Sequence, residues 1–383
     1  MKKTIVVIFG GRSGEHEISI RSARTVIEQA NPTKYHVVPV AISPGGQWMS
    51  PADSVALFPP GTRQLFIERY GLPQNERLAM LGDAGLEGLV ELCTDCGKAC
   101  PTHSTTVDVI FPVLHGTYGE DGTIQGLFEM ADIPYVGCGV LASSCGMDKV
   151  FMKTLFRDAD LPICDYVWFL RSEWQKDRKA TIARVSAKLG YPCFVKPANL
   201  GSSVGVSKAV DAASLAAAID LAAEYDRKII VEEGLEMREI ECAVLGNDNA
   251  QASLPGEYII RDETKKFLDY TEKYSGTGNN EFVVPAPISD ELTERVRRMA
   301  VRAFKAIDGS GLARVDFFLL NNDSALLVNE INTMPGLTDA SGWPKMWQGS
   351  GKEFSQVIDE LIELAIQRHE DKKMNRTDRR HDS

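Results

Sequence analysis

The sequence lacks long apolar runs. It contains no uninterrupted stretch of about 18 apolar residues, the length that a helix needs to cross a bilayer. Its N-terminus also lacks the basic-then-apolar pattern of a secretory signal. We therefore expect a protein of the cytoplasm that does not partner a membrane.

Positive charge is also scarce. Lys and Arg together number 42 against 53 Asp and Glu, so the formal net charge is −11. Nucleic-acid phosphates select basic surfaces, which excludes nucleic acid as the main partner. A site for a polyphosphate ligand would need a local concentration of Lys, Arg or metal to offset the ligand's charge.

Two common nucleotide-binding motifs are missing. No Gly-Lys-Ser/Thr opens a helix as in a Walker A loop, and "VIFGGRSGEHEIS" (7–19) lacks the full G-x-G-x-x-G of dinucleotide-binding proteins. A dehydrogenase is therefore disfavoured. The chain has 383 residues, of which 44% are apolar and 25% charged, as in a soluble globular protein of two or three domains.

The eight cysteines include one local cluster, C-x2-C-x3-C-x2-H. Without an export signal we expect reduced thiols. Cys93, Cys96, Cys100 and His103 could supply four zinc ligands, but the spacings are short for a standard zinc module. A Cys-rich hairpin or loop is the alternative.

Hydrophobic patterns predict an α/β protein. The segment begins β-α-β, with strands at 4–9 and 35–42 around a helix at 19–29. Residues 50–105 are rich in Pro, Gly and polar residues and show no clear pattern. The remaining predictions are strands at 107–113, 193–196, 228–232 and 239–245, helices at 148–159, 176–189, 211–225, 290–307 and 353–368, and a hairpin at 311–332. The tail after 370 has little to bury and is expected to be disordered.

The predicted hairpin carries a group of polar residues. Residues two apart on a strand share a face, so Arg314 pairs with Asp316 on one strand and Glu330 with Asn332 on the other. The two faces coincide if Asp316 lies opposite Glu330, which we expect to require an odd-length turn. Two carboxylates and an amide beside an Arg suit Mg²⁺ with phosphate. A surface salt-bridge face is the alternative.

Two Gly-rich segments are further candidates. "FVKPANLGSSVGVSK" (194–208) ends a strand at Lys196 and continues as a Gly/Ser loop, whose N–H groups and hydroxyls could wrap phosphate. A flexible surface loop is the alternative. "PVLHGTYGEDGTIQG" (112–126) places His115 at a strand end, where a hydrogen-bonded structural His is the alternative.

Taken together, these segments resemble the D-alanine–D-alanine ligase family of the ATP-grasp fold. The resemblance covers residues 4 to about 368, apart from about 50–105. Its elements appear in the family's order: "GGRSGEHEIS", "LHGTYGEDGTIQG", "GCGVLASSCGMDK", "FVKPANLGSSVGVSK", "EIECAVLG", "FLDYTEKY", "GLARVDFFL" and "NEINTMPG". It implies domains at 1–143, 144–238 and 239–370, with a tail at 371–383. ATP would be held between the central and C-terminal domains.

The resemblance also implies an activity. One D-alanine carboxylate attacks the γ-phosphate of ATP to form D-alanyl phosphate, and the amine of a second D-alanine displaces phosphate. The product is the dipeptide used in peptidoglycan. D-Ala–D-Ser and D-Ala–D-Lac ligases, a glutathione-synthetase-like ligase and an ATP-binding module without turnover are the alternatives. Two Mg²⁺ or Mn²⁺ ions, K⁺ as a candidate further ion, and a homodimer are the family expectations.

Site roles follow from position in the matching motifs. The resemblance assigns ATP contacts to Lys149, Lys196, Ser202, Ser203, Glu232, Glu233, Leu235, Glu239, Lys273 and Asn329. It assigns D-alanine binding to Glu15, His115, Arg314, Gly336, Ser341 and Gly342, and metal binding to Asp316, Glu330 and Asn332. Glu15, Ser202, Tyr274, Arg314 and Ser341 form the implied catalytic set.

One loop bears on specificity. Residues 261–281 are expected to close over the site and exclude water, with Tyr274 linked to Glu15 and Ser202. "DYTEKY" is the dipeptide type, which favours an amine acceptor over lactate. Three features depart from the family pattern: Glu233 replaces a Lys of some members, the turn of the hairpin is one residue longer, and the Cys/His cluster has no counterpart.

Overall fold

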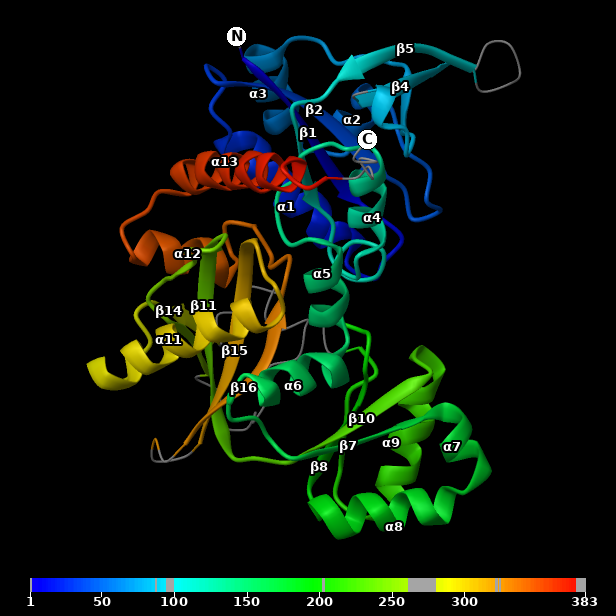
Figure 1. Ribbon diagram of the computed structural model, residues 1–383, viewed down its shortest axis with the longest axis vertical. Coiled ribbons are helices and arrows are strands. Elements are labelled where there is room, and N and C mark those ends of the chain that lie inside the picture. The colour runs from blue at the N-terminus through cyan, green and yellow to red at the C-terminus, as the bar shows by residue number, and fades with distance from the viewer. Residues whose placement is uncertain are drawn as a thin grey trace, which may run out of the picture.

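The structure is a computed structural model that describes residues 2–86, 88–93, 100–201, 204–260, 280–320, 323 and 325–376. Within these ranges the strands form four sheets (Figure 1). Two lie in the N-terminal third, one in the middle of the chain and one in the C-terminal part. In the described part of the chain, every helix is too short or too polar to cross a bilayer.

The first sheet is parallel, with strand order β2-β1-β6. Its strands are β1 (Lys3–Gly10), β2 (Tyr35–Ile42) and β6 (Val109–Val113). Strands covered on both faces read as continuous apolar runs, and Val6 pairs with Val38 on one side and Ile110 on the other. The predicted β-α-β start is confirmed, although helix α1 (His16–Gln29) begins three residues before the predicted Ser19.

The segment without a clear sequence pattern folds into short elements. They are helices α2 (Pro51–Ala56) and α3 (Pro60–Tyr70) and an antiparallel sheet of β3 (Arg77–Met80), β4 (Gly88–Cys93) and β5 (Cys100–Thr106). Ser50 caps α2 by accepting from the Asp53 N–H, with Pro51 at the first helical position. The shorter elements carry too few turns or alternations to show a period, and the eleven-residue α3 fully buries only Thr62 and Phe66, so it has no apolar stripe.

The middle of the chain forms an antiparallel sheet in the order β7-β10-β8-β9. Its strands are β7 (Tyr166–Leu170), β10 (Lys228–Glu233), β8 (Cys193–Pro197) and β9 (Ser207–Ala209), packed with α7 (Arg171–Lys176), α8 (Arg178–Leu189) and α9 (Ala212–Tyr225). Helices α5 (Val140–Met147) and α6 (Lys149–Asp158) lead into this part from α4 (Thr123–Met130).

The largest sheet lies in the C-terminal part, in the order β14-β13-β11-β15-β16, with β12 paired to β11. Its strands are β11 (Met237–Gly246), β12 (Gln251–Ala252), β13 (Gly256–Ile260), β14 (Asn280–Val283), β15 (Gly311–Leu320) and β16 (Leu326–Asn332). Helix α11 (Asp290–Ala306) covers this sheet and begins at Ser289, which accepts from the Leu292 N–H as a cap.

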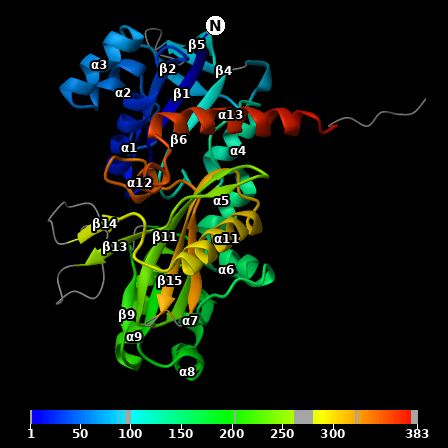
Figure 2. The same ribbon diagram turned by 90° about the vertical axis from the view of Figure 1, so that its left-hand side faces the viewer.

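Two C-terminal helices connect the N-terminal strands to this large sheet. Helices α12 (Gly342–Gly349) and α13 (Phe354–Lys373) lie between them in both views (Figures 1 and 2). Their apolar side chains join one core with residues of β1, β6 and β15, and the Trp343 indole N–H donates to the Ala313 carbonyl. Helix α13 continues past the predicted end at 368, so 371–373, assigned to a disordered tail, are helical. There Lys372 is ion-paired with Glu129.

The hairpin of β15 and β16 has the predicted pairing for a different reason. Asp316 lies opposite Glu330 and Arg314 opposite Asn332, whereas Phe317 lies opposite Val328. The strand bounds, Leu320 and Leu326, leave five residues between them, which is an odd length as expected. However, Leu319 pairs with Leu326 and the Leu320 N–H donates to the Ala325 carbonyl, so regular pairing continued from the turn would not bring Asp316 opposite Glu330. A β-bulge supplies the extra residue, Asn329, and shifts the register by one.

Candidate active site

The β15–β16 hairpin brings the predicted polar residues together on one face. Arg314 donates from Nε to Oδ1 of Asp316 (2.6 Å) and from Nη2 to Oδ2 (2.7 Å). The Asn332 amide donates to the same Oδ2 (3.0 Å). A two-pronged guanidinium–carboxylate pair of this kind is strong and directional. The alternative of an exposed salt-bridge face is wrong, because Asp316 is buried.

A second buried carboxylate joins this patch from β11. Glu241 lies opposite Asp316 in the β11–β15 pairing, and its Oε2 is 3.4 Å from Nε of Arg314. One guanidinium therefore stands between two carboxylates. Glu241 was not predicted from the sequence, although an acid within the apolar stretch of "EIECAVLG" was the available signal.

The charges of the patch shift the pKa values of its two carboxyl groups, Asp316 and Glu330. Burial and the nearby Glu241 and Glu330 raise the pKa of Asp316 to about 7, while Arg314 opposes the rise. Burial also acts to raise the pKa of Glu330, but Lys149, Lys196 and Arg314 outweigh it and the pKa is lowered. Carboxylates with opposite shifts in one buried patch are typical of a functional site.

The donor set suits a hard divalent cation. Asp316, Glu330 and Asn332 offer carboxylate and amide oxygens, which Mg²⁺ and Mn²⁺ prefer. Within the described ranges, no group of three or more His, Cys, Asp or Glu is placed to hold a metal. An ion here would therefore need further oxygens, such as those of phosphate, to complete its coordination.

Lys149 lies beside the patch at the start of α6. Its Nζ donates to the Leu200 carbonyl (2.8 Å) and is 3.9 Å from Oε2 of Glu330. Asp148 caps the helix by accepting from the Val150 and Phe151 N–H groups, which fixes the Lys149 backbone. A small cavity of about 30 Å³ separates these elements. Its lining includes Glu120, Lys149, Gly201, Glu330, Asn332 and Thr333.

A second cluster of charges lies on the neighbouring sheet. Lys196 of β8 donates to Oε2 of Glu232 on β10 (2.6 Å). Lys153 of α6 lies 2.9 Å from the other carboxylate oxygen, Oε1. The two ammonium groups outweigh the effect of burial and lower the pKa of Glu232 well below its usual range. Lys153 was not predicted, although it follows Lys149 by one helical turn.

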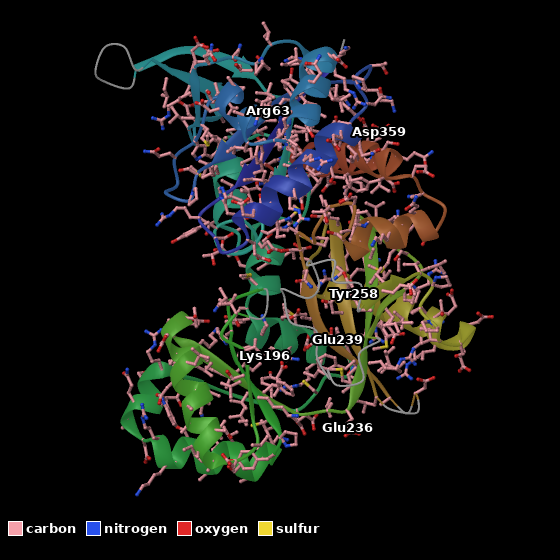
Figure 3. All side chains as sticks on the ribbon, turned by 180° about the vertical axis from the view of Figure 1, so that it is seen from behind. Arg63, Lys196, Glu236, Glu239, Tyr258 and Asp359 are labelled. Carbon is pink, nitrogen blue, oxygen red and sulfur yellow. The ribbon has the colours of Figure 1, made fainter. Side chains whose placement is uncertain are left out.

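The other residues predicted to contact the nucleotide flank this cluster. Glu233 accepts a hydrogen bond from the Asp165 N–H (2.7 Å), so the backbone just before β7 fixes its side chain. Leu235 is half-buried between β10 and β11, and Glu239 is exposed on β11. Figure 3 labels Lys196 and Glu239, which come from two different sheets. Asn329 is the bulge residue, and its carbonyl accepts from Lys153 (3.2 Å).

The N-terminal residues form a third cluster. A Cβ at Gly116, which has φ +75°, would lie 2.8 Å from Oε2 of Glu15, so glycine lets the backbone approach this carboxylate. His115 is buried with both ring nitrogens bound, one to Ser22 Oγ (3.1 Å) and one to the Met334 carbonyl (3.0 Å). Burial lowers the pKa of His115. These contacts are those of a hydrogen-bonded structural His, the alternative given for His115. The ring holds the chain after β6 beside Glu15.

Glu120 completes this third cluster and was also missed. It accepts hydrogen bonds from the Gly116 N–H (2.7 Å) and the Met334 N–H (3.2 Å). Burial, followed by the nearby Glu15, raises the pKa of Glu120 to about 8. An acid in the Gly-rich stretch 112–126 was visible in the sequence, but nothing local marked it as buried.

The start of α12 meets the hairpin patch from the other side. A Cβ at Gly342 would lie 2.7 Å from the Phe282 ring and 2.8 Å from Oε2 of Glu241, so glycine lets the helix begin close to both side chains. Ser341 is buried, and its Oγ lies 2.7 Å from Oγ1 of Thr338. Gly336 lies in the connection between β16 and α12. The N–H groups of a helix start suit an anion.

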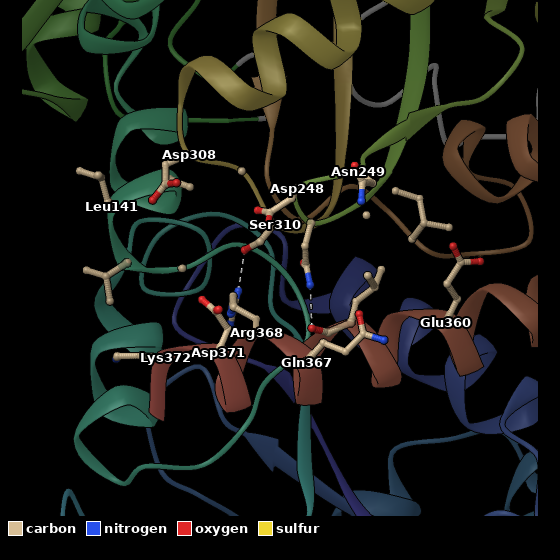
Figure 4. A pocket seen from close by; sticks show the side chains of 18 of the residues that line it. Leu141, Asp248, Asn249, Asp308, Ser310, Glu360, Gln367, Arg368, Asp371 and Lys372 are labelled. Atoms are coloured by element: carbon tan, nitrogen blue, oxygen red, sulfur yellow. Dashed lines mark hydrogen bonds between the residues drawn. The ribbon is translucent and has the colours of Figure 1, made fainter. Parts of the chain in front are cut away.

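Several predicted residues lie outside the described ranges. They are Ser202, Ser203, Lys273, Tyr274 and Cys96, together with the side chains of Cys93, Cys100 and His103. A cavity of about 620 Å³ between α5, the turn after β11 and α13 contains none of the predicted site residues (Figure 4). The predicted site residues that the structure describes lie instead in or beside the three charged clusters described above.

Two family models and several curated relatives match most of the chain. The model of the D-ala D-ala ligase N-terminus matches residues 4–138, including the segment 50–105, and the model of the D-ala D-ala ligase C-terminus matches residues 155–363. A D-alanine–D-alanine ligase of Heliobacterium modesticaldum is 46% identical over 99% of both chains. One of Thermoanaerobacter sp. is 45% identical over 97% of this chain and 98% of that one.

Solved structures show the same relationship. The D-alanine–D-alanine ligase of Coxiella burnetii has a TM-score of 0.79 and 33% identity, covering 97% of this chain and 96% of that chain. The VanG D-Ala:D-Ser ligase of Enterococcus faecalis has a TM-score of 0.79 and 36% identity, covering 95% of this chain and 100% of that chain. The chain therefore belongs to the D-alanine–D-alanine ligase family and has the ATP-grasp fold.

Proposed function

We propose that this chain is an ATP-dependent ligase that joins two D-alanines into D-alanyl-D-alanine for peptidoglycan synthesis. The observation that carries the proposal is the convergence of Arg314, Asp316, Glu330 and Asn332 beside Lys149, in a chain of this family. The loss of a metal ligand or of the Arg would have favoured a binding module without turnover, and these residues are all present.

The nucleotide is assigned to the interval between the β7–β10 sheet and the β11–β16 sheet. Lys149 and Lys196 are the proposed cations for the phosphates, and each already lies within reach of a carboxylate at the site. The residues from Glu232 to Leu235 are proposed to line the adenine edge and Glu239 to meet the ribose. Such positioning and charge neutralisation account for most of phosphoryl-transfer catalysis.

The metal site is assigned to Asp316, Glu330 and Asn332. The oxygen-only donor set fits Mg²⁺ or Mn²⁺, and the family expectation is two ions. Bound there, the ions would neutralise negative charge on the phosphates.

The two amino acids are assigned to opposite sides of Arg314. Glu15 is proposed to hold the ammonium group of the first D-alanine, in the cluster with His115 and Glu120. Ser341 and Gly342, at the start of α12, are proposed to bind the carboxylate of the second. Arg314 and the Gly336 N–H would then face the carbonyl oxygen between them, where negative charge develops during acyl transfer.

The reaction proceeds in two steps. A carboxylate oxygen of the first D-alanine bonds to the γ-phosphorus and ADP leaves, which produces D-alanyl phosphate. The amine of the second D-alanine, after losing its proton, attacks the acyl carbon and inorganic phosphate leaves. Tyr274 and Ser202 remain proposed members of the catalytic set, and a homodimer in the cytoplasm remains the proposed working form.

Product analysis tests the proposal. ATP, Mg²⁺ and D-alanine should release phosphate and yield D-alanyl-D-alanine, identified by mass, with D-serine and D-lactate added in parallel reactions. The structural likeness to a D-Ala:D-Ser ligase makes D-serine the second candidate acceptor. Phosphate release only with D-serine or D-lactate would change the acceptor, and no turnover with any D-amino acid would reject the ligase.

A further inference from the structure

Lys153 is a buried lysine to which no role has been given. It lies on α6, is 1% exposed, and meets atoms of three other segments. Its Nζ lies 2.9 Å from Oε1 of Glu232 and donates to the Asn329 carbonyl (3.2 Å) and to Sγ of Cys164 (3.4 Å). A lysine so buried must be paired, because an isolated charge in the interior is very costly.

The carboxylate of Glu232 is shared by two lysines. Lys153 faces one oxygen and Lys196 the other, at 2.9 and 2.6 Å. The third titratable neighbour, the buried Cys164 thiol, has its pKa raised to about 11 by burial and by Glu232, and is neutral. The two cations differ in access, since the Lys196 side chain is 14% exposed and that of Lys153 only 1%.

This difference matters once a nucleotide binds. Lys196 is the proposed phosphate contact, yet in the structure its ammonium is bound to Glu232. Phosphate and Glu232 therefore compete for the same ammonium. Without a second cation, moving Lys196 toward phosphate would leave a buried carboxylate unpaired, which carries a large penalty. With Lys153 in place, Glu232 keeps a counter-ion whichever way Lys196 turns.

We propose that Lys153 is a positioning residue that neutralises Glu232 and so releases Lys196 to bind the phosphates of the nucleotide. This inference rests on the proposed function for the role of Lys196. The proposed role concerns phosphate binding and not the transfer step, so loss of Lys153 should change KM for ATP more than kcat. The contact with the Asn329 carbonyl holds the Lys153 ammonium in place, because it anchors the group to the β-bulge.

The test is a double-mutant cycle of Lys153→Met and Glu232→Gln, with exposed Lys179→Met on α8 as the matched control. The probe is Mg²⁺-tripolyphosphate, whose binding is measured by calorimetry in the full chain. It carries no adenine, so a lost base contact at Glu232 does not enter. It also needs no D-alanine, so the result stands even if the ligase activity is not found.

We expect Lys153→Met to weaken tripolyphosphate binding by about tenfold or more, which is roughly the loss of one phosphate contact. In the Glu232→Gln background the same change should have less than about a threefold effect, because no carboxylate then competes for Lys196. Turnover assays should show KM for ATP rising while kcat changes little. The Lys179→Met control should bind as the parent does.

Two outcomes would overturn the inference. One is a loss of binding on Lys153→Met that is just as large in the Glu232→Gln background. The other is unchanged tripolyphosphate affinity in a folded Lys153→Met protein. If Lys153→Met alone does not fold, the double variant decides, since it removes both members of the buried pair. Its tripolyphosphate affinity should lie within about threefold of the parent value, and a loss of about tenfold or more would overturn the inference.

Discussion

Replacing Arg314 by Met should sharply reduce turnover. In the structure Arg314 makes two hydrogen bonds to Asp316 and lies 3.4 Å from Glu241, so it is the cation at the centre of the acidic patch. It is also the proposed donor to the carbonyl oxygen of the reacting acyl group. Loss of one such donor typically lowers kcat by about 10²–10³, or roughly 3–4 kcal/mol of transition-state stabilisation.

Arg314→Lys separates charge from geometry. Lysine retains the positive charge but lacks the planar fork that reaches both oxygens of Asp316, so we expect kcat to remain at least about tenfold below that of the parent. The matched control is Arg178→Met, because Arg178 makes a similar two-pronged contact with Asp220 at the surface of α8. This control should change kcat by less than about twofold.

The assay is steady-state phosphate release with saturating ATP, Mg²⁺ and D-alanine. Thermal unfolding of each variant is measured in parallel, so that a loss of folded protein is not mistaken for a loss of catalysis. A kcat for Arg314→Met within about threefold of the parent value would refute the assignment of Arg314 to the reacting carbonyl. Equal kcat for Arg314→Lys and the parent would show that charge alone suffices.

Four further predictions concern the metal site, Glu120 and Ser341. Glu330→Gln should lower kcat by orders of magnitude at fixed Mg²⁺ while thermal unfolding stays cooperative, and near-normal kcat would remove the metal assignment. Chelation of divalent ions should abolish phosphate release, and Mg²⁺ or Mn²⁺ should restore it. Glu120, with a folded-state pKa of about 8, stays neutral when folded but ionises above about pH 4.5 when unfolded. The free energy of unfolding without ligands should therefore contain a component that falls between pH 4.5 and 8, which Glu120→Gln removes. Urea titrations at several pH values measure this free energy, and the same dependence on pH in Glu120→Gln and the parent would contradict the prediction. Ser341→Ala should raise the KM for D-alanine in its acceptor role more than it lowers kcat, and unchanged kinetics would dismiss the acceptor site.

Local patterns in the sequence were sufficient for much of the fold. The continuous apolar run 4–9 predicted β1 because a parallel strand is covered on both faces. The alternation in 311–320 placed Arg314 and Asp316 on one face, since that relation depends only on spacing along one strand. The elements in 50–105 escaped prediction because most are too short to show a period and because the eleven-residue α3 has no apolar stripe.

Register was decided by the tertiary structure. The connection has an odd number of residues as expected, but a bulge at Asn329, and not regular pairing across the turn, brings Asp316 opposite Glu330. A bulge depends on the elements packed against both strands, and here Lys153 of α6 donates to the carbonyl of the bulge residue, Asn329. No pattern within 311–332 contains this information.

The sequence by itself determined which residue types were available for phosphate, metal and D-alanine, and on which strand face some of them lie. Only the tertiary structure decided that Lys153 and Glu241 are buried, and Glu120 half-buried, beside them. Each gains its role from partners far along the chain, as Glu120 does from Met334. Burial and pKa shifts arise from such long-range contacts, so a local sequence pattern cannot contain them.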